Sequence, residues 1–115
     1  MSNKYTSDSK KQFEGKVVII TGSTQGSGAE TAKLFAARGA KAITICGRQE
    51  NKGIQIKKEI EELGSRCLYV KADLSKVEDC KKIVALTDKE FGTVHSLVNV
   101  AGHTERGTIL SATLE

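Results

Sequence analysis

Short runs of apolar, mostly β-branched residues alternate with longer amphipathic stretches along most of the chain. The first of these runs, Val17-Val18-Ile19-Ile20, has no polar residue to face water. A continuous apolar run of this length is typical of a parallel strand that is buried on both faces. The pattern predicts strands over residues 16–21, 42–46, 67–70 and 97–100.

The stretches between the apolar runs repeat their apolar residues at helical spacing, which predicts helices over residues 27–38, 50–63 and 75–91. The apolar face of the first helix consists of Ala29, Ala32, Phe35 and Ala36. Its small side chains would let the helix lie close to a sheet. The second helix carries Gly53 on the face of Ile56, Ile60 and Leu63, where a glycine leaves room for close packing. The glycines that we expect to end the helices are Gly39, Gly64 and Gly92.

The third helix has the clearest amphipathic pattern in the chain. We expect it to begin with a capping box, in which Ser75 is the N-cap and Glu78 reaches back to it. The expected apolar face consists of Val77, Cys80, Val84, Thr87 and Phe91.

Strands that alternate with helices through short turns require a parallel sheet with helices on both faces. The predicted fold is therefore α/β, a Rossmann-like doubly wound sheet with the element order βαβαβαβ and the strand order 3-2-1-4. Residues 1–12 are polar without periodicity, and we expect a disordered tail there. Residues 13–115 would then form one half-domain of the doubly wound fold.

The net charge and the spacing of the cysteines exclude several classes of protein. The net charge is +4, and charges of both signs are interspersed along the predicted helices. This balance suits an anionic ligand but provides no basic stripe for nucleic acid. Three cysteines without CxxC spacing are expected to be buried and reduced. No signal peptide or membrane-length apolar run occurs in the sequence, so we expect a cytoplasmic protein without membrane contact.

A glycine-rich turn joins the first predicted strand to the first predicted helix. A strand, a glycine-rich turn and a helix bring backbone N–H groups and a helix N-terminus to one point, which is typical of a phosphate site. Gly22 would allow the tight turn, Gly26 would let a pyrophosphate approach, and Gly28 would let the helix pack closely. The spacing GxxxGxG departs from the common GxGxxG, and a turn without a ligand is the alternative. The turn reads Thr21-Gly22-Ser23-Thr24-Gln25-Gly26-Ser27-Gly28.

Four segments in order resemble the short-chain dehydrogenase/reductase family over about residues 15–115. The turn is similar to the family's TGxxxGxG, and Gly47-Arg48 stands where the second strand meets the cofactor's ribose. Ala72-Asp73-Leu74 is similar to the family's aspartate after the third strand. Asn99-Val100-Ala101-Gly102 resembles its NNAG motif, with Val100 in place of the second asparagine.

The resemblance implies a nicotinamide dinucleotide site. Residues of the turn would cradle the pyrophosphate, and Asp73, with Leu74 beside it, would bond the adenine amino group. The alternative for Asp73 is a helix cap, a role that Ser75 is expected to fill. Asn99 would line the ribose or brace neighbouring strands as a buried amide. The implied cofactor-binding residues are Gly22, Ser23, Thr24, Gln25, Gly26, Ser27, Gly28, Gly47, Arg48, Asp73, Leu74, Asn99, Ala101 and Gly102.

The end of the second strand predicts NADP(H) as the cofactor, in preference to NAD(H). Members that prefer NAD place an acid there, whereas this chain has Gly47 followed by Arg48. A guanidinium can form two hydrogen bonds with a 2′-phosphate, and no carboxylate is expected nearby to repel that phosphate. The alternative for Arg48 is a solvated residue at the start of a helix.

The family's activity is hydride transfer between the nicotinamide and a small carbonyl or alcohol substrate. Its catalytic asparagine, serine, tyrosine and lysine lie downstream of NNAG, and the sequence ends at Glu115 before those positions. Tyr69 is expected to lie inside the third strand, away from the C-terminal end of that strand. A lone histidine in a loop, such as His103, is more often polar lining than a proton donor. We therefore expect cofactor binding without turnover. The alternatives are a non-catalytic nucleotide-binding module and a fragment that self-associates through an exposed fourth strand.

Overall fold

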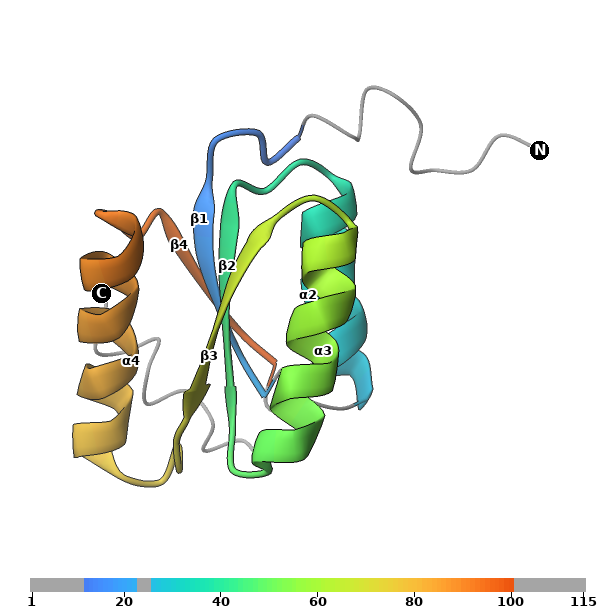
Figure 1. Ribbon diagram of the computed structural model, residues 1–115. Helices are drawn as coiled ribbons and strands as arrows, with labels where there is room; N and C mark the ends of the chain where they lie inside the picture. The colour runs from blue at the N-terminus through green and yellow to red at the C-terminus, as the bar shows by residue number, and fades with distance from the viewer. Residues whose placement is uncertain (1–11, 23–25, 101–115) are drawn as a thin grey trace.

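The computed structural model describes residues 12–22 and 26–100, which form alternating strands and helices (Figure 1). Each element lies close to the range predicted for it. Positive-φ glycines follow the helices at Gly39, Gly64 and Gly92, as expected. In chain order the elements are β1 (Val17–Thr21), α2 (Gly26–Ala37), β2 (Ala42–Gly47), α3 (Glu50–Glu62), β3 (Arg66–Lys71), α4 (Val77–Phe91) and β4 (Ser96–Asn99).

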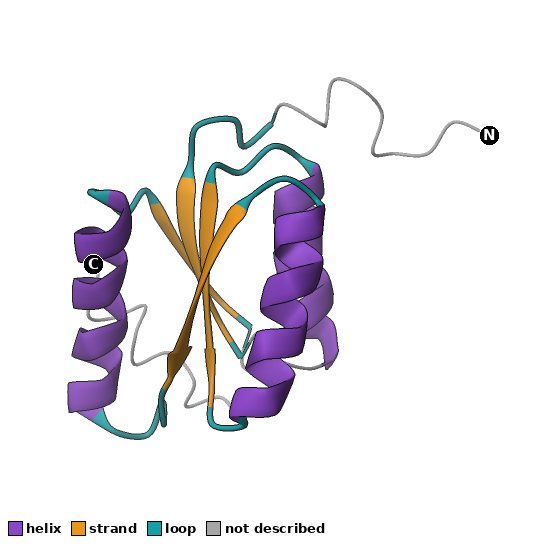
Figure 2. Cartoon of the chain, viewed as in Figure 1, coloured by secondary structure: helices purple, strands orange, loops and turns teal. Residues whose placement is uncertain are grey.

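The sheet has the strand order β3-β2-β1-β4, with all neighbouring strands parallel. In β1, Ile19 pairs with Thr44 of β2 on one side and with Leu97 of β4 on the other. Figure 2 shows α2 and α3 together on one face of the sheet and α4 on the opposite face. The predicted doubly wound α/β fold and its strand order are confirmed.

Two apolar layers hold the helices to the sheet. Successive residues of β1 point to opposite faces, so Val18 and Ile20 join the layer under α2 and α3. Ile19 joins Ile83 of α4 in the other layer. All five residues of β1 are buried, which explains the continuous apolar run of its first four residues.

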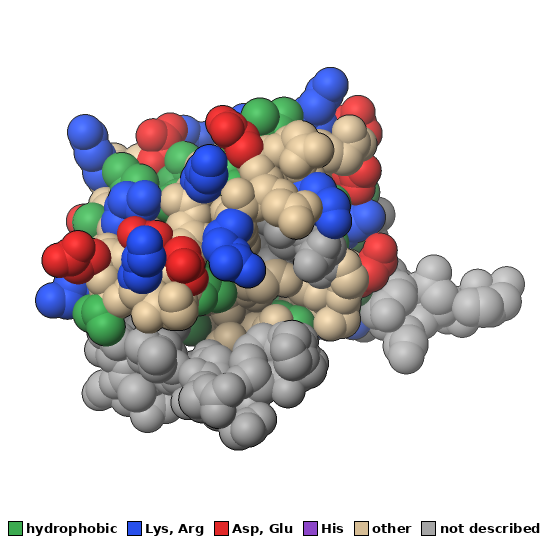
Figure 3. Space-filling model, turned by 90° about the horizontal axis from the view of Figure 1, so that it is seen from below, with side chains coloured by type: hydrophobic (Ala, Val, Ile, Leu, Met, Phe, Trp, Pro, Cys, Tyr) green, Lys and Arg blue, Asp and Glu red, His purple; other side chains and the backbone are tan. Residues whose placement is uncertain are grey.

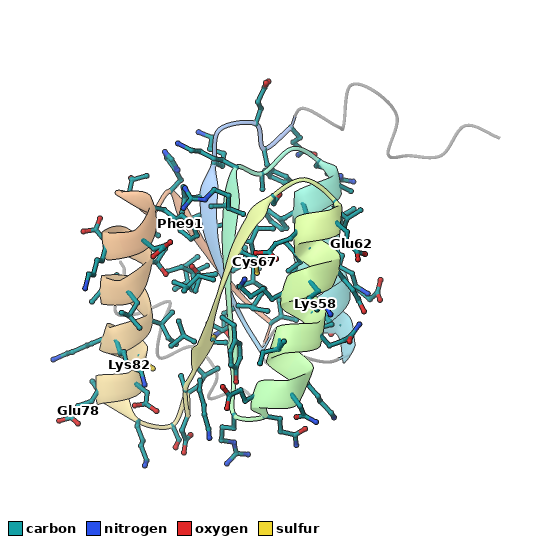
Figure 4. The ribbon with its side chains drawn as sticks, in the orientation of Figure 1. Lys58, Glu62, Cys67, Glu78, Lys82 and Phe91 are labelled. Carbon is teal, nitrogen blue, oxygen red and sulfur yellow. The ribbon has the colours of Figure 1, made fainter. Side chains whose placement is uncertain are left out.

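The three cysteines are buried thiols, as predicted. Burial raises the pKa of Cys46 and that of Cys67 to about 12, so both thiols keep their protons at neutral pH. Figure 4 shows Cys67 between β3 and α3, whereas Lys58 and Glu62 point outward from α3. These cysteines therefore act as small core residues.

The predicted capping box at the start of α4 is wrong. The N-cap is Lys76, which makes no side-chain cap hydrogen bond. Ser75 instead donates its hydroxyl and its N–H to Oδ1 of Asp73, at 2.7 and 3.0 Å. A carboxylate two residues upstream competes successfully for these donors, forming an Asx turn.

The apolar face of α4 also differs from the predicted one. Cys80 and Thr87 are buried as predicted, but Ile83, which the prediction omits, has no exposed surface, and Val77 is 54% exposed. The predicted face therefore extended one turn too far toward the N-terminus of the helix. In the described part of the chain, no helix is long and apolar enough to cross a membrane.

The outer strand β4 is fastened to β1 at both ends. At the amino end, the N–H of Val17 donates to Nδ1 of His95 and the N–H of His95 donates to the carbonyl of Val17, both at 2.9 Å. At the carboxyl end, the hydroxyl of Thr21 lies 2.8 Å from Oδ1 of Asn99 and donates to it. Side-chain groups thus extend the backbone ladder of this pair of strands.

A buried pair of hydroxyls joins α4 to the centre of the sheet. The hydroxyl oxygens of Thr87 and Thr44 are 2.8 Å apart, and both residues have no exposed surface. The Thr87 hydroxyl is also 2.7 Å from the carbonyl of Ile83, which can only accept. Since each hydroxyl has one proton, Thr87 donates to Ile83 and accepts from Thr44.

We expect Thr87→Val to lower the free energy of unfolding by about 1–3 kcal/mol, because it leaves a buried hydroxyl on Thr44 without its partner. Thr44→Val should destabilise less, because the Thr87 hydroxyl still donates to the carbonyl of Ile83. The double variant should lose clearly less than the sum of the single losses, since it leaves neither hydroxyl behind. Denaturant unfolding of the four proteins measures this coupling, and strictly additive losses would show that the two hydroxyls do not interact.

Candidate functional site

The carboxyl ends of the parallel strands meet at one edge of the sheet, which we call the carboxyl edge. Gly22 follows β1, Gly47 ends β2, Asp73 follows β3 closely and Asn99 ends β4. In open α/β sheets, ligands bind in the crevice outside this edge. Figure 3 views the molecule from this end, where basic side chains lie among acidic ones. The structure therefore brings together predicted site residues from all four strands.

Two glycines of the turn adopt backbone conformations that other residues rarely take. Gly22 has φ +65° and Gly26 has φ +61°. A Cβ on Gly22 would overlap the carbonyl oxygen of Val100, so this glycine serves close packing next to β4 as well as the turn. Around Gly26, apart from its chain neighbours and the adjoining backbone of α2, no described atom lies within 4 Å of the Cβ position. The turn thus needs Gly22 for packing, and it leaves open space at Gly26.

Helix α2 begins at this open space. Its first turn contains no acidic residue, and its first N–H groups have no partner within the helix. The positive end of the helix dipole therefore points to the carboxyl edge with no negative side chain of its own to neutralise it. Gly28, two residues further on, is buried, whereas Ser27 is exposed. This arrangement favours an anion such as a pyrophosphate.

At the end of β2, two hydrogen bonds fix the carbonyl of Gly47. The N–H of Ala72 donates to it at 3.1 Å, and the hydroxyl of Tyr69 donates at 2.7 Å. Tyr69 lies inside β3, as expected, but its side chain leans along the strand, so its hydroxyl reaches the end of β2. Sequence reasoning missed this residue. The signal was Gly53 on the apolar face of α3, since its missing side chain makes room for the Tyr69 ring.

Asp73 has a charged carboxylate at this edge. Its hydrogen bonds from the hydroxyl and N–H of Ser75 lower the pKa of the carboxyl, and the nearby charges of Arg48 and Lys76 lower it further. The expectation that no carboxylate lies near Arg48 is therefore wrong. Asp73 also accepts the hydrogen bonds that close the turn before α4, whereas the sequence had predicted Ser75 as the capping residue there. Both bonds from Ser75 go to Oδ1.

Asn99 accepts the hydroxyl of Thr21 on Oδ1, so it braces β1 against β4 at the carboxyl edge. Bracing neighbouring strands was one of the two roles predicted for Asn99 from the sequence. Leu74 is half-buried and packs against the layer under α4. The remaining predicted residues, Ser23, Thr24, Gln25, Ala101 and Gly102, lie outside the described residues, as does His103.

The sequence model described as short chain dehydrogenase matches residues 16–115. The chain belongs to the short-chain dehydrogenase family. A relative in Nepeta racemosa, (+)-cis,trans-nepetalactol synthase NEPS1, is 37% identical over 81% of the chain and 33% of its own length. The 11-beta-hydroxysteroid dehydrogenase A of Sesamum indicum is 42% identical over 76% of the chain and 25% of its own length. The chain thus spans a third or less of these two relatives.

Solved structures of the family share the fold. A hydroxysteroid dehydrogenase from Escherichia coli has a TM-score of 0.74 at 26% identity, over 80% of this chain and 37% of its own. A short-chain dehydrogenase/reductase from Burkholderia phymatum in complex with NAD has a TM-score of 0.71 at 27% identity, over 76% of this chain and 31% of its own. Proteins of this short-chain dehydrogenase family bind nicotinamide dinucleotides, and the residues matched by the family model include the described part of the carboxyl edge.

We expect Gly26→Val to lower the affinity for NADPH and NADH at least tenfold, because a side chain would fill the open space at the N-terminus of α2. A β-branched residue at positive φ also strains the backbone, by about 1–2 kcal/mol. Gly15→Val is the matched control. Gly15 has φ +80° and open space around its Cβ position, but it precedes β1 at the opposite end of the sheet.

Titration calorimetry and thermal unfolding of both variants separate these effects. The two substitutions should lower the melting temperature comparably, and only Gly26→Val should weaken nucleotide binding. Normal NADPH binding by a folded Gly26→Val variant would mean that the phosphates lie elsewhere.

Proposed function

We propose that the chain binds NADP(H) across the carboxyl edge and forms the cofactor-binding part of an NADP(H)-dependent short-chain oxidoreductase. In the whole protein, a hydride would pass between the nicotinamide and a carbonyl or alcohol substrate. One observation supports this most: the open space at Gly26 lies at the N-terminus of α2, on the same edge as Arg48 and Asp73. The pyrophosphate of a dinucleotide would lie at the N-terminus of α2, and its adenosine would lie beside Arg48 and Asp73.

The end of β2 favours a 2′-phosphate over a 2′-hydroxyl. The strand ends in Gly47, so no side chain there accepts a ribose hydroxyl, and the exposed Arg48 follows directly. A guanidinium and a phosphate form a bidentate, charge-assisted pair, which is stronger than a hydrogen bond between neutral groups. Arg48 would hold the 2′-phosphate in this way.

Asp73 competes with that phosphate for Arg48 but does not cancel its charge. Its carboxylate carries one negative charge, and Oδ1 already accepts two hydrogen bonds from Ser75. A phosphate monoester carries about 1.5 to 2 negative charges near neutral pH and offers three acceptor oxygens. The charge of Lys76, which also lowers the pKa of Asp73, further compensates the negative charge of this carboxylate. Asp73 would then remain available for the adenine amino group.

Self-association through β4 is a second candidate function. Within residues 12–22 and 26–100, β4 pairs only with β1, and its middle residues are half-buried. An outer strand with unpaired backbone groups can add a strand from another chain. A nucleotide-binding module without catalysis would have the same cofactor site, and a turnover assay of the whole protein distinguishes it from an enzyme.

We place the protein in a reducing compartment such as the cytoplasm because its cysteines are buried thiols.

Arg48 decides the cofactor preference in this account. We expect NADPH to bind about 10–100 times more tightly than NADH, because a charge-assisted pair contributes roughly 1.5–3 kcal/mol. Arg48→Ala should remove most of that preference by weakening NADPH and leaving NADH nearly unchanged. Calorimetric titration with both nucleotides measures the two affinities.

Lys41→Ala is the control for a general loss of positive charge. Lys41 is an exposed cation just before β2, at the opposite end of the same strand. Its removal should leave the preference intact. Equal affinities of the unaltered protein for the two nucleotides, or an unchanged preference in Arg48→Ala, would rule out this role of Arg48.

A further inference from the structure

The hydroxyl of Tyr69 has no part in the proposed function, yet it lies at the carboxyl edge. Tyr69 pairs with Ile45 in the middle of the β2–β3 ladder, and its ring leans along the strand to reach the carbonyl of Gly47 at 2.7 Å. Burial raises the pKa of this hydroxyl, and the nearby Glu50 and Cys46 raise it further. The hydroxyl therefore keeps its proton at neutral pH and acts as a donor.

Helix α3 makes the space that the Tyr69 ring needs. A Cβ on Gly53 would overlap three atoms of that ring. A glycine inside a helix destabilises it by roughly 0.5–1 kcal/mol relative to alanine. Gly53 is also buried, so no solvent-facing role accounts for it. The glycine in α3 and the tyrosine in β3 thus match each other, and together they bring a hydroxyl to the end of β2.

The receiving carbonyl belongs to the most adaptable residue of this segment. Gly47 has no side chain to restrict its backbone, and it immediately precedes Arg48. Its carbonyl accepts the N–H of Ala72 at 3.1 Å as well as the Tyr69 hydroxyl, so two donors hold it. Because a peptide unit is planar, holding the carbonyl of Gly47 also fixes the direction of the Arg48 N–H and the start of Arg48.

We propose that Tyr69 is a positioning residue for cofactor specificity: through the carbonyl of Gly47 it holds Arg48 where a 2′-phosphate would bind. This inference rests on the proposed function, since it needs Arg48 to bind that phosphate. Tyr69 touches neither the cofactor nor the substrate in this account. A tyrosine that served only to fill the core would contribute its ring, and its hydroxyl would be dispensable.

Tyr69→Phe separates the two roles because it keeps the ring and removes the hydroxyl. The probes are adenosine 2′,5′-bisphosphate and AMP, which differ only in the 2′-phosphate, titrated by calorimetry into the full-length protein. We expect the preference for the bisphosphate to fall about three- to tenfold, the range of one hydrogen bond. The affinity for AMP should stay within about twofold. A purely structural hydroxyl would lower the melting temperature without changing this ratio.

Gly53→Ala tests the same link from the helix. It displaces the ring without altering the hydroxyl, so it should lower the preference for the 2′-phosphate in the same way. Combined with Tyr69→Phe it should lower the preference no further, because the hydroxyl is already gone. Independent, additive effects on the ratio would contradict the proposed link. If Gly53→Ala fails to fold, Tyr69→Phe decides alone.

A measurement without ligand keeps this inference distinguishable from the proposed function. The NMR order parameter of the Arg48 amide should be lower in Tyr69→Phe than in the unaltered protein, while that of Val70 stays unchanged. If the unaltered protein shows no preference for the bisphosphate, the proposed function and the inference both fail. If the preference exists and Tyr69→Phe retains it, or if the Arg48 amide does not loosen, only the inference is overturned.

Discussion

The structure depends on the burial of β1 between two helical layers. All five of its residues are buried, and it pairs with β2 and β4 at once. A strand in this position has no freedom to shift register, because a slip by one residue would move its side chains to the wrong layer. The end of β1 is therefore a fixed point, from which the glycine-rich turn and α2 start. The candidate site is rigid where its backbone begins at this strand.

The amino end and the carboxyl edge of the sheet differ in the contacts that their residues make. At the amino end, β3 contacts α4: the guanidinium of Arg66 lies 5.0 Å from the centre of the Phe91 ring, and it forms a solvent-exposed ion pair with Glu90. At the carboxyl edge, charged groups are held next to open space instead. Oδ2 of Asp79 accepts the N–H of Asp73 at 2.7 Å, which fixes the turn after β3. The residues that would contact a cofactor thus stand on a backbone that other residues restrain.

Hydrophobic periodicity was sufficient to predict the strands, the helices and their order, because buried parallel strands and amphipathic helices leave direct traces in the sequence. The carboxyl edge followed from the topology alone. The start of α4 could not be predicted in this way. Ser75 had two carboxylates within reach, Asp73 and Glu78, and the spacing of residues does not determine which of them accepts its hydrogen bonds. Tyr69 was missed because its contact with Gly47 depends on the lean of a side chain across two strands.

The central claim is that a dinucleotide lies across the carboxyl edge, with its adenosine near β2 and β3. Amide ¹H–¹⁵N NMR spectra recorded during a titration with NADP⁺ test this most directly, since every described backbone N–H serves as a probe. We expect saturable shifts at Gly22, Gly26, Arg48 and Asp73, and none at Gly64 or His95 at the amino end. Shifts that concentrate at the amino end, or no saturable shift at any concentration up to the millimolar range, would contradict it.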